Sequence, residues 1–309
     1  MVQFQCNLCG ARQSAGEKQL LDQARPATCA GCRSTTLSRA IIRLLALEVF
    51  GQNLALPDWP PIKTLRGLGL SDSGAYAKRL EYLFDYRNTF YDREPQFDIT
   101  ARHPEQDESL DFLISSEVFE HVRPPVNRAF EEAFRILKPG GTLFLSVPYL
   151  NLGDTVEHFP TLGEFGLAEV GEQAVLVNRL PNGSYEVLSD ISFHSGVDDS
   201  DQALEMRLFS KPALAEALSS AGFAEVEFRG EGCLENGIVH SSWSHPVVAR
   251  KAPCRRADAV TRELASSLVE LRRQARAANK SRWNRLGRRL RLGPQLVVDS
   301  RLPEKDRKE

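Results

Sequence analysis

Four cysteines near the N-terminus have the spacing of metal ligands. They form two identical Cys-x-x-Cys pairs, Cys6 with Cys9 and Cys29 with Cys32, separated by 19 residues. Two thiolates spaced in this way can both reach one ion, and two such pairs complete the tetrahedral shell that Zn²⁺ prefers. Because sulfur fills every ligand position, the predicted ion is structural rather than catalytic. The alternatives are four unliganded thiols or a redox pair, and neither pair follows a strand and opens a helix as a redox pair would.

A second group of side chains suited to chemistry follows an apolar run in the middle of the chain. Glu117, Glu120 and His121 come directly after Phe112-Leu113-Ile114. An imidazole titrates near neutrality and can remove a proton from a reacting group, so His121 is a candidate general base. The competing prediction is that Glu120 and His121 cap and orient the helix that follows.

The elements around this group form a strand–helix–strand unit. Phe112–Ile114 and Leu143–Leu145 are continuous apolar runs, which is typical of parallel strands that are covered on both faces. Between them an apolar stripe repeats at helical spacing, and Pro124-Pro125 and Lys138–Gly141 suit the start and the end of a helix. Such a unit has a right-handed crossover. The stripe consists of Val126, Phe130, Ala133, Phe134 and Leu137.

The same unit resembles the class I S-adenosylmethionine-dependent methyltransferases. Their fourth strand ends in a phrase like EVFEHV, which is Glu117–Val122 here, and their next helix closes with LKPGG, which is Leu137–Gly141 here. The resemblance extends from about Ile62 to Val248. It implies an α/β fold, with a doubly wound Rossmann-like sheet that ends in an antiparallel hairpin. It also implies S-adenosylmethionine as the methyl donor.

The resemblance further implies a glycine-rich turn after the first strand, where the backbone can approach the donor closely. Gly67-Leu68-Gly69 follows Ile62–Leu65, which is the predicted first strand, while Ser71–Gly74 replaces the usual third glycine and Arg66 replaces the usual acid. Acids after the next strands would hold the ribose hydroxyls and the adenine amino group, and each could instead be a solvated loop carboxylate. The predicted donor-binding residues are Gly67, Leu68, Gly69, Asp72, Asp92 (with Glu94 second), Asp98 and Glu117.

The sequence divides into four parts. Residues 1–35 form the predicted zinc ribbon, 36–61 a helix over Thr36–Phe50 and a linker, 62–250 the methyltransferase domain, and 251–309 a basic helical tail. The helix should pack the ribbon against the larger domain, and Ser34, Thr35 and Thr36 are its candidate caps. Within the domain we expect two helices in addition to the one described above. One spans Ala75–Phe84, and the other opens at Phe209–Pro212, runs to Ser220 and closes at Gly222. Further strands are expected at Thr89–Tyr91, near Asp98-Ile99, at Ala224–Phe228 and at Val247–Ala249.

Residues 150–207 are an insertion after the fifth strand. Ala174–Leu180 and Ser184–Leu188 predict a hairpin that turns at Pro181-Asn182-Gly183. Because ligands of doubly wound folds bind beyond the carboxyl ends of the strands, this insertion is expected to cover the acceptor as a lid. His158 and His194 lie in it and are alternative bases, or else packed histidines.

Charge is distributed unevenly along the chain. From Lys251 onward there are 17 Lys or Arg against 7 Asp or Glu, whereas the rest carries 22 against 34. Arg272–Arg291 contains nine basic residues and no acid. This stretch is expected to bind RNA or an anionic membrane surface, or to be a solvated or partner-docking helix.

The composition favours a cytoplasmic globular protein, since the N-terminus lacks a secretory signal and no apolar run reaches the roughly 20 residues of a membrane span. The segments Phe84–Thr100 and Leu204–Ser210 are similar to bacterial methyltransferases associated with glycan assembly. The resemblance therefore implies O-methylation of a sugar, a glycan precursor or a small molecule. The alternatives are an RNA methyltransferase that grips its substrate with ribbon and tail, and a non-catalytic binding module.

Overall fold

The structure is a computed structural model of the whole chain. It describes residues 1–21, 28–103, 107–170, 173–189, 191, 193–195, 202–251, 267, 269–271, 273–274 and 277. In the predicted tail helix the structure describes residues 267, 269–271, 273–274 and 277, and these residues are helical. The remainder of Arg272–Arg291 and Cys254 lie outside the described residues.

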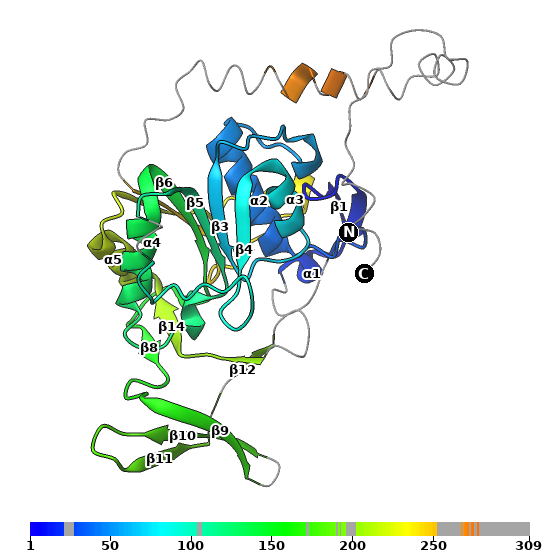
Figure 1. Cartoon of the computed structure of the whole chain (residues 1–309). Coiled ribbons are helices and arrows are strands. Elements are labelled where there is room, and N and C mark those ends of the chain that lie inside the picture. Colours follow the sequence, from blue (N-terminus) through cyan, green and yellow to red (C-terminus); the bar gives the residue numbers. More distant parts are fainter. Residues whose placement is uncertain are drawn as a thin grey trace.

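A six-stranded mixed sheet forms the centre of the molecule (Figure 1). Its order is β15-β16-β6-β5-β3-β4. The strands β4, β3, β5 and β6 run parallel, whereas β16 is antiparallel to β6 and β15 to β16. This confirms the doubly wound sheet with a final antiparallel hairpin. The bounds are β3 Arg66–Leu70, β4 Asp85–Thr89, β5 Leu110–Ser116, β6 Leu137–Ser146, β15 Glu225–Phe228 and β16 Val247–Arg250.

Helices cover both faces of this sheet. On one face α2 (Thr36–Phe50) and α3 (Ala77–Leu83) pack against Phe112, Ile114 and Phe144. On the other face α4 (Asn127–Ile136) and α5 (Lys211–Ala221) pack against a second apolar cluster that includes Leu113 and Leu143. Each fully buried large apolar side chain contributes roughly 1.5–3 kcal/mol. The apolar runs Phe112–Ile114 and Leu143–Leu145 are therefore strands buried on both faces, as predicted.

Two helices begin and end at the predicted signals. Thr35 caps α2, because its hydroxyl accepts a hydrogen bond from Ser38 N at 3.1 Å, and Gly51 ends the helix with φ 67°. Ser210 caps α5 in the same way, through Ala213 N at 3.2 Å, and Gly222 ends it with φ 112°. Each such cap is worth about 1 kcal/mol.

Three predicted strand positions were wrong. The first strand is Arg66–Leu70 and not Ile62–Leu65, where Leu65 N instead closes a turn onto Ile62 O. The second is Asp85–Thr89 and not Thr89–Tyr91. Near Asp98-Ile99 the described residues form no strand; a single parallel bridge joins Phe90 to Gln96. Glycines have low strand propensity, which made β3 difficult to recognise.

The N-terminal ribbon packs into the same core as the sheet. A hairpin of β1 (Val2–Gln5) and β2 (Arg12–Ala15) precedes the short helix α1 (Glu17–Leu21). Phe4, Leu8 and Leu20 join α2 and the sheet in one apolar cluster. The helix α2 therefore packs the ribbon against the larger domain, as expected.

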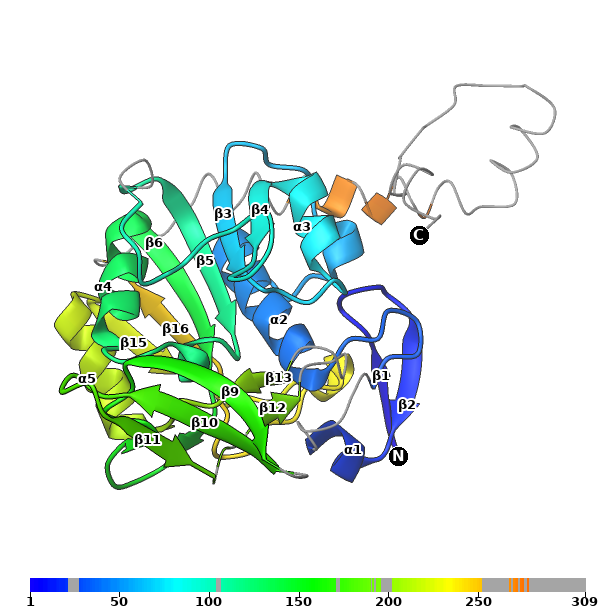
Figure 2. The same ribbon diagram turned by 60° about the horizontal axis from the view of Figure 1, so that its bottom comes forward.

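The insertion forms small sheets at one end of the molecule (Figures 1 and 2). The predicted hairpin is present as β10 (Gln173–Arg179) and β11 (Tyr185–Leu188), and β9 (Glu164–Val170) adds a third strand that the sequence did not predict. Nearer the body, β14 (Arg207–Ser210) pairs with β7 (Tyr149–Leu150) and β8 (Val156–Glu157). A further pair joins β12 (Phe193–Ser195) to β13 (Gln202–Leu204).

The remaining elements are short. They are the 3-10 turns η1 (Leu56–Asp58), η3 (Phe119–His121) and η4 (Leu234–Asn236). None of the helices in the described ranges combines the length and the apolar character that crossing a membrane requires.

Candidate active site and metal centre

The glycines predicted to cradle the donor lie inside β3. Their positions leave room for aromatic rings from the two neighbouring strands. A Cβ atom at Gly67 would overlap the ring of Phe112, and one at Gly69 would overlap the Tyr86 hydroxyl and the Asp72 carboxylate. The rings of Tyr86 and Phe112 stack, with centroids 6.0 Å apart. Gly67 and Gly69 thus serve the packing of the sheet, and the turn after the strand is Ser71–Gly74.

Asp72 is buried and holds this turn in place. Its carboxylate accepts hydrogen bonds from the Tyr76 hydroxyl at 2.9 Å and from the Tyr86 hydroxyl. The Asn88 side chain accepts from Asp72 N at 2.8 Å and donates to Asp72 O at 2.9 Å. Burial raises the pKa of Asp72 to about 7, against the lowering effect of the two phenols. Asp72 therefore points away from the edge where a ligand would lie.

The turn itself has two features that suit a ligand. Ser71 adopts φ 55° and its side chain is exposed, and a Cβ atom at Gly74 would have nothing within 4 Å. The register pairs Leu70 with Ser115, so this turn lies beside the end of β5.

The other predicted donor acids lie on the loop after β4. Asp92 is exposed, and its carboxylate lies 3.9 Å from Arg93. Asp98 is half-buried, and its Oδ1 accepts hydrogen bonds from Thr100 N at 2.8 Å and Thr100 Oγ1 at 2.7 Å. Asp98 thus stabilises its own turn, while Asp92 is open to solvent. Within the described residues, neither Asp92 nor Asp98 forms a hydrogen bond with the Ser71–Gly74 turn.

Two carboxyl groups follow β5 directly. Glu117 adopts φ 56°, and its backbone N–H donates to Ser146 O at 2.9 Å. Burial raises the pKa of Glu117 to about 7, although a hydrogen bond with the Ser146 side chain lowers it. Glu120 is 0 % exposed, and burial raises its pKa well above the ordinary range, with a further rise from Glu117. Within the described chain neither oxygen of Glu120 has a hydrogen-bond partner.

His121 is held in one tautomer beside Glu120. Its Nδ1 lies 3.0 Å from Leu204 O, and a carbonyl oxygen can only accept, so the neutral ring carries its proton on Nδ1. The other nitrogen, Nε2, then has a lone pair, and it lies 3.8 Å from Glu120 Oε1. The alternative role of Glu120 and His121 as helix caps is not observed, since the N-cap of α4 is Val126 and has no side-chain cap bond.

The segment Leu204–Arg207 covers this acid–imidazole group. Met206 N donates to Glu120 O at 2.8 Å. Arg207 is 0 % exposed; its Nη1 donates to Phe119 O at 3.0 Å and Val122 O at 2.6 Å, and its Nε donates to Glu157 Oε1 at 2.8 Å. The insertion therefore reaches the end of β5. Arg207 was not among the predicted site residues, although an arginine in an otherwise apolar strand was a signal for it.

The two alternative histidines occupy different places. His158 is exposed, and its backbone N–H donates to Met206 O at 2.9 Å. His194 lies on β12, where it pairs with Ala203, and its side chain is outside the described part. Of the two predicted bases whose side chains are described, His121 lies beside the buried carboxyls and His158 is exposed.

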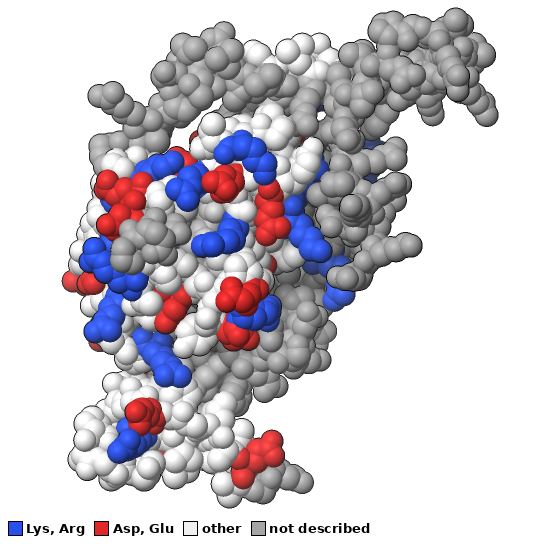
Figure 3. All heavy atoms as spheres, viewed as in Figure 1, with Lys and Arg blue, Asp and Glu red and all other residues white. Residues whose placement is uncertain are grey.

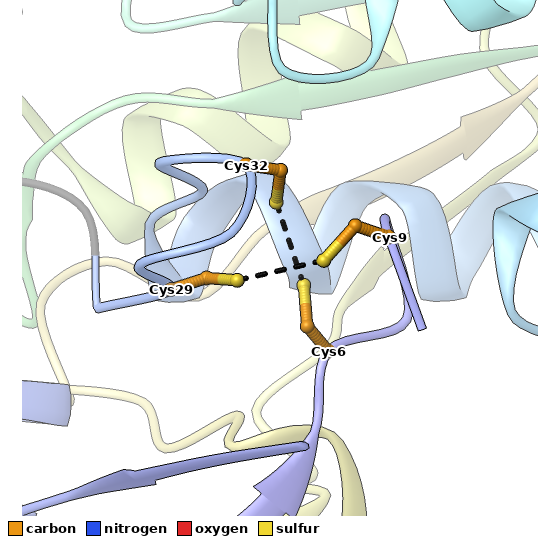
Figure 4. A group of neighbouring side chains, drawn as sticks. All are labelled: Cys6, Cys9, Cys29 and Cys32. Carbon is orange, nitrogen blue, oxygen red and sulfur yellow. Dashed lines mark hydrogen bonds between the residues drawn. The ribbon is translucent and has the colours of Figure 1, made fainter. Parts of the chain in front are cut away.

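The four predicted zinc ligands converge from two loops (Figure 4). Their sulfur atoms all lie within 4.8 Å of one another. Cys6 Sγ lies 3.7 Å from Cys32 Sγ, and Cys9 Sγ lies 3.6 Å from Cys29 Sγ. The hydrogen bond from Cys32 lowers the pKa of Cys6 to about 4, against the raising effect of burial.

The two knuckles have matching backbones. Gly10 N donates to Cys6 O at 2.7 Å, and Arg33 N donates to Cys29 O at 2.8 Å; both residues adopt positive φ, 78° and 59°. Backbone N–H groups of Leu8 and Cys9 also bond to the Cys6 sulfur, which lowers its pKa. This arrangement suits thiolates bound to an ion.

A buried arginine balances the charge of the cluster. Arg39 is 0 % exposed and donates to Ser34 O at 3.1 Å, Thr28 Oγ1 at 2.8 Å and Gly237 O at 2.8 Å. Burial lowers its pKa, and the four cysteines raise it. A tetrathiolate zinc centre carries a net charge of −2, so a nearby guanidinium offsets part of it. The donor set and its surroundings fit Zn²⁺.

The fit to S-adenosylmethionine rests on the edge formed by β3 and β5. The open space at Gly74, the exposed Ser71 and the unpartnered oxygen of Glu117 can receive a polar ligand there. The space at Gly67 and Gly69 is filled by Phe112 and Tyr86 and can receive none. Ser71–Gly74 and Glu117 are thus the residues that would hold the donor.

Comparison with known proteins finds one family and several solved structures that are similar to this chain. The family described as methyltransferase domain matches residues 83–145. No curated protein matches the chain. Similar solved structures include the CMeT domain of the citrinin polyketide synthase, with 14 % identity and a TM-score of 0.39 over 72 % of this chain and 54 % of that one.

Two further similar solved structures are methyltransferases. One is the Burkholderia thailandensis 1,6-didemethyltoxoflavin-N1-methyltransferase, with 13 % identity, a TM-score of 0.34, and coverage of 71 % of this chain and 88 % of that one. The other is an S-adenosylmethionine-dependent methyltransferase from Clostridium acetobutylicum, with 9 % identity, a TM-score of 0.36, and coverage of 68 % of this chain and 96 % of that one. The chain spans about half the length of the two structures that match first.

The described part of the chain therefore combines a doubly wound six-stranded sheet with a cluster of four cysteines. Residues 83–145, which match the methyltransferase domain family, include β4, β5 and α4 of that sheet and its helices.

Proposed function

We propose that this protein transfers a methyl group from S-adenosylmethionine to a hydroxyl oxygen of a sugar or another small polar acceptor. The observation that supports it most is the orientation of His121. Its Nδ1 is bonded to Leu204 O, and its Nε2 lies 3.8 Å from Oε1 of the buried Glu120. A general base must be held in a fixed orientation next to the reacting group, and the bond to Leu204 holds the His121 ring in this way.

The methyl donor supplies an electrophilic methyl group on a sulfonium. The residues of the chain then have three tasks: to align the acceptor oxygen with that methyl, to exclude water and to take the proton. His121 Nε2 accepts the hydroxyl proton as the oxygen–carbon bond forms and the carbon–sulfur bond breaks. The products are a methyl ether, S-adenosylhomocysteine and a proton on the imidazole. The Leu204 carbonyl stabilises the imidazolium by accepting from Nδ1.

The proposal places donor binding on the Ser71–Gly74 turn and Glu117. Asp92 and Asp98 remain predicted contacts to the ribose and the adenine, because they follow β4 at the same edge of the sheet. Gly67, Leu68 and Gly69 act indirectly, since they position the turn from inside β3. His158 and His194 belong to the insertion, which covers the acceptor.

The proposed metal is one structural Zn²⁺ bound by Cys6, Cys9, Cys29 and Cys32. Convergence of four sulfurs within 4.8 Å supports it. Its proposed role is to fix the ribbon on α2, because Cys6 and Cys29 belong to the same apolar cluster as α2 and the sheet.

A specific observation favours a second candidate, a methyltransferase-like module without activity. The rings of Phe112 and Tyr86 occupy the space at Gly67 and Gly69, and Asp72 is turned away from the ligand edge. A protein of this kind would fold and bind zinc, yet bind no methyl donor.

The experiment uses the zinc-loaded full chain with S-adenosylmethionine labelled in the methyl group. Separate reactions receive RNA, glycan precursors or small hydroxylated metabolites. We expect label in a methyl ether of a small or glycan acceptor, and incorporation about a hundredfold slower or more after His121→Gln. Label in RNA would instead support the RNA reading, in which Arg272–Arg291 grips the phosphates, and that binding should weaken steeply with salt.

A further inference from the structure

Two buried polar side chains beside the proposed base have atoms that the fold does not use. Glu120 is 0 % exposed and both of its oxygens lack a hydrogen-bond partner in the described chain. Arg207 is 0 % exposed, and its Nη2 likewise has none among the same residues. Buried polar groups are normally satisfied, because an unmade hydrogen bond costs the full desolvation of the group. Such groups persist where a ligand completes them.

These atoms lie in one cluster at the end of β5. Arg207 Nη1 donates to Phe119 O at 3.0 Å and to Val122 O at 2.6 Å, which are the carbonyls on either side of Glu120 and His121, and Met206 N donates to Glu120 O at 2.8 Å. The 3.8 Å between Glu120 Oε1 and His121 Nε2 means that one small group can contact both.

The kinds of unsatisfied atoms define the missing partner. Glu120 offers acceptors, and Arg207 Nη2 offers a donor. An ammonium group can only donate, and a phosphate or carboxylate can only accept, whereas a hydroxyl does both. A neutral Glu120 carboxyl, which its burial favours, adds an O–H donor of its own. The cluster therefore matches neighbouring hydroxyl groups, each of which can complete an acceptor and a donor together.

We propose that Glu120 and Arg207 form an acceptor subsite that binds a hydroxyl adjacent to the one methylated, so that the enzyme selects vicinal diols. The inference rests on the proposed function for the place of the reacting hydroxyl. The subsite is closed by Leu204–Arg207, which is bonded to Glu120 O and to His121 Nδ1.

The first test is thermal unfolding of the zinc-loaded full chain. Glu120→Met replaces an unsatisfied carboxyl by an unbranched apolar side chain, and the melting temperature is expected to rise by about 2–4 °C. The matched control is Glu132→Met. Glu132 is also buried, but it accepts hydrogen bonds from Arg135 Nε at 2.8 Å and His103 N at 3.2 Å, so its loss should lower the melting temperature. A fall for Glu120→Met would show that the fold needs this carboxyl and would overturn the proposal.

The second test measures binding of three ring probes by saturation-transfer NMR: cis-1,2-cyclohexanediol, cyclohexanol and cyclohexylammonium. The wild type is expected to bind the diol about tenfold more tightly than either of the others. Glu120→Met should abolish this preference, and Glu120→Gln, a neutral isostere, should retain it within about threefold. Equal binding of the three probes, or a preference that survives Glu120→Met, would refute the subsite. The measurement requires no methyl transfer, so it stays separate from failure of the proposed activity.

Discussion

The chemistry of this protein depends on a few residues whose environment is set by their neighbours. His121 would be an ordinary surface imidazole without Leu204, whose carbonyl fixes its tautomer at 3.0 Å. Glu120 would be an ordinary carboxylate without Met206 and Arg207, which close over it. Burial and a bonded backbone, more than residue type, therefore make these positions suited to catalysis.

Replacing the proposed base should reduce turnover and leave the donor bound. For His121→Gln the expected fall in kcat is roughly 10²- to 10⁴-fold, which is the usual contribution of a general base. The dissociation constant for S-adenosylmethionine should change less than about twofold. Rates from a labelled-methyl assay and calorimetric titration check the two quantities. His158→Gln is the matched control, because His158 is exposed, and equal losses for both variants would argue against His121 as the base.

Asp72 gives the stability of the fold a defined pH dependence. Folding raises its pKa from 3.8 to about 7, so its protonated form stabilises the fold fully below about pH 4. That stabilisation is lost as pH rises through about 7, and it amounts to the order of a few kcal/mol.

The variant Asp72→Asn should remove this contribution from the pH dependence. The difference in unfolding free energy between the variant and the wild type should grow between pH 4 and 7 and then stay constant. The unfolding free energy of the variant should itself still depend on pH, because burial also raises the pKa of Glu117 to about 7. Denaturant titrations at several pH values provide the comparison, and a difference that does not change with pH would mean that Asp72 stays ionised in the fold.

At the scale of elements, the sequence predicted what periodicity and capping determine. The strands β5 and β6, the helices α2 and α5 and the final hairpin have strong local signals such as Thr35, Ser210 and Gly222. The prediction placed the first strand a few residues before β3. The glycines of β3 make room for the rings of Phe112 and Tyr86, which come from neighbouring strands. Long-range packing of this kind leaves no pattern within a short window.

The candidate site was predictable to a similar extent. The two Cys-x-x-Cys pairs were enough to predict that four cysteines converge, and Glu117 and His121 follow from the strand that precedes them. The pairing of Arg207 with Glu157, 50 residues apart, depends on how the insertion folds back. The tautomer of His121 likewise depends on Leu204, which is 83 residues away.

A pair of glycine variants should separate the role of β3 from that of the turn. Gly69→Ala should lower the free energy of unfolding by about 1–3 kcal/mol, because its Cβ atom overlaps Tyr86 and Asp72. Gly74→Ala should leave stability within about 0.5 kcal/mol, since nothing lies within 4 Å, and should weaken donor binding. Chemical unfolding and calorimetry give both quantities. The opposite pattern would restore Gly67–Gly69 as the donor turn.

On the scale of the whole molecule, the ribbon, α2 and the sheet form one folding unit. They share a single apolar cluster, and Arg39 links the cysteine loops to Gly237 near the C-terminal hairpin, 198 residues away. On the face shown in Figure 3, basic and acidic side chains are interspersed over the described residues. The described residues of this face therefore form no continuous basic surface for a nucleic acid.

Removal of zinc should consequently destabilise the entire protein and not the ribbon alone. Chelation, or Cys6→Ser, is expected to lower the melting temperature in a single transition, because structural zinc contributes directly to folding. Metal analysis should give one zinc per chain before chelation. Cys233→Ser is the control, since Cys233 lies outside the cluster. An unchanged melting temperature in zinc-free protein would show that the ribbon folds independently of its metal.

Binding of a nucleoside at the edge formed by β3 and β5 is the hypothesis on which the proposed activity depends. Calorimetric titration of the zinc-loaded full chain with S-adenosylhomocysteine measures this binding. We expect one binding site per chain with a dissociation constant in the micromolar range. We also expect Gly74→Val to weaken this binding about tenfold or more while the fold remains intact. Absence of binding by folded protein, or unchanged binding in the variant, would refute donor binding at this edge.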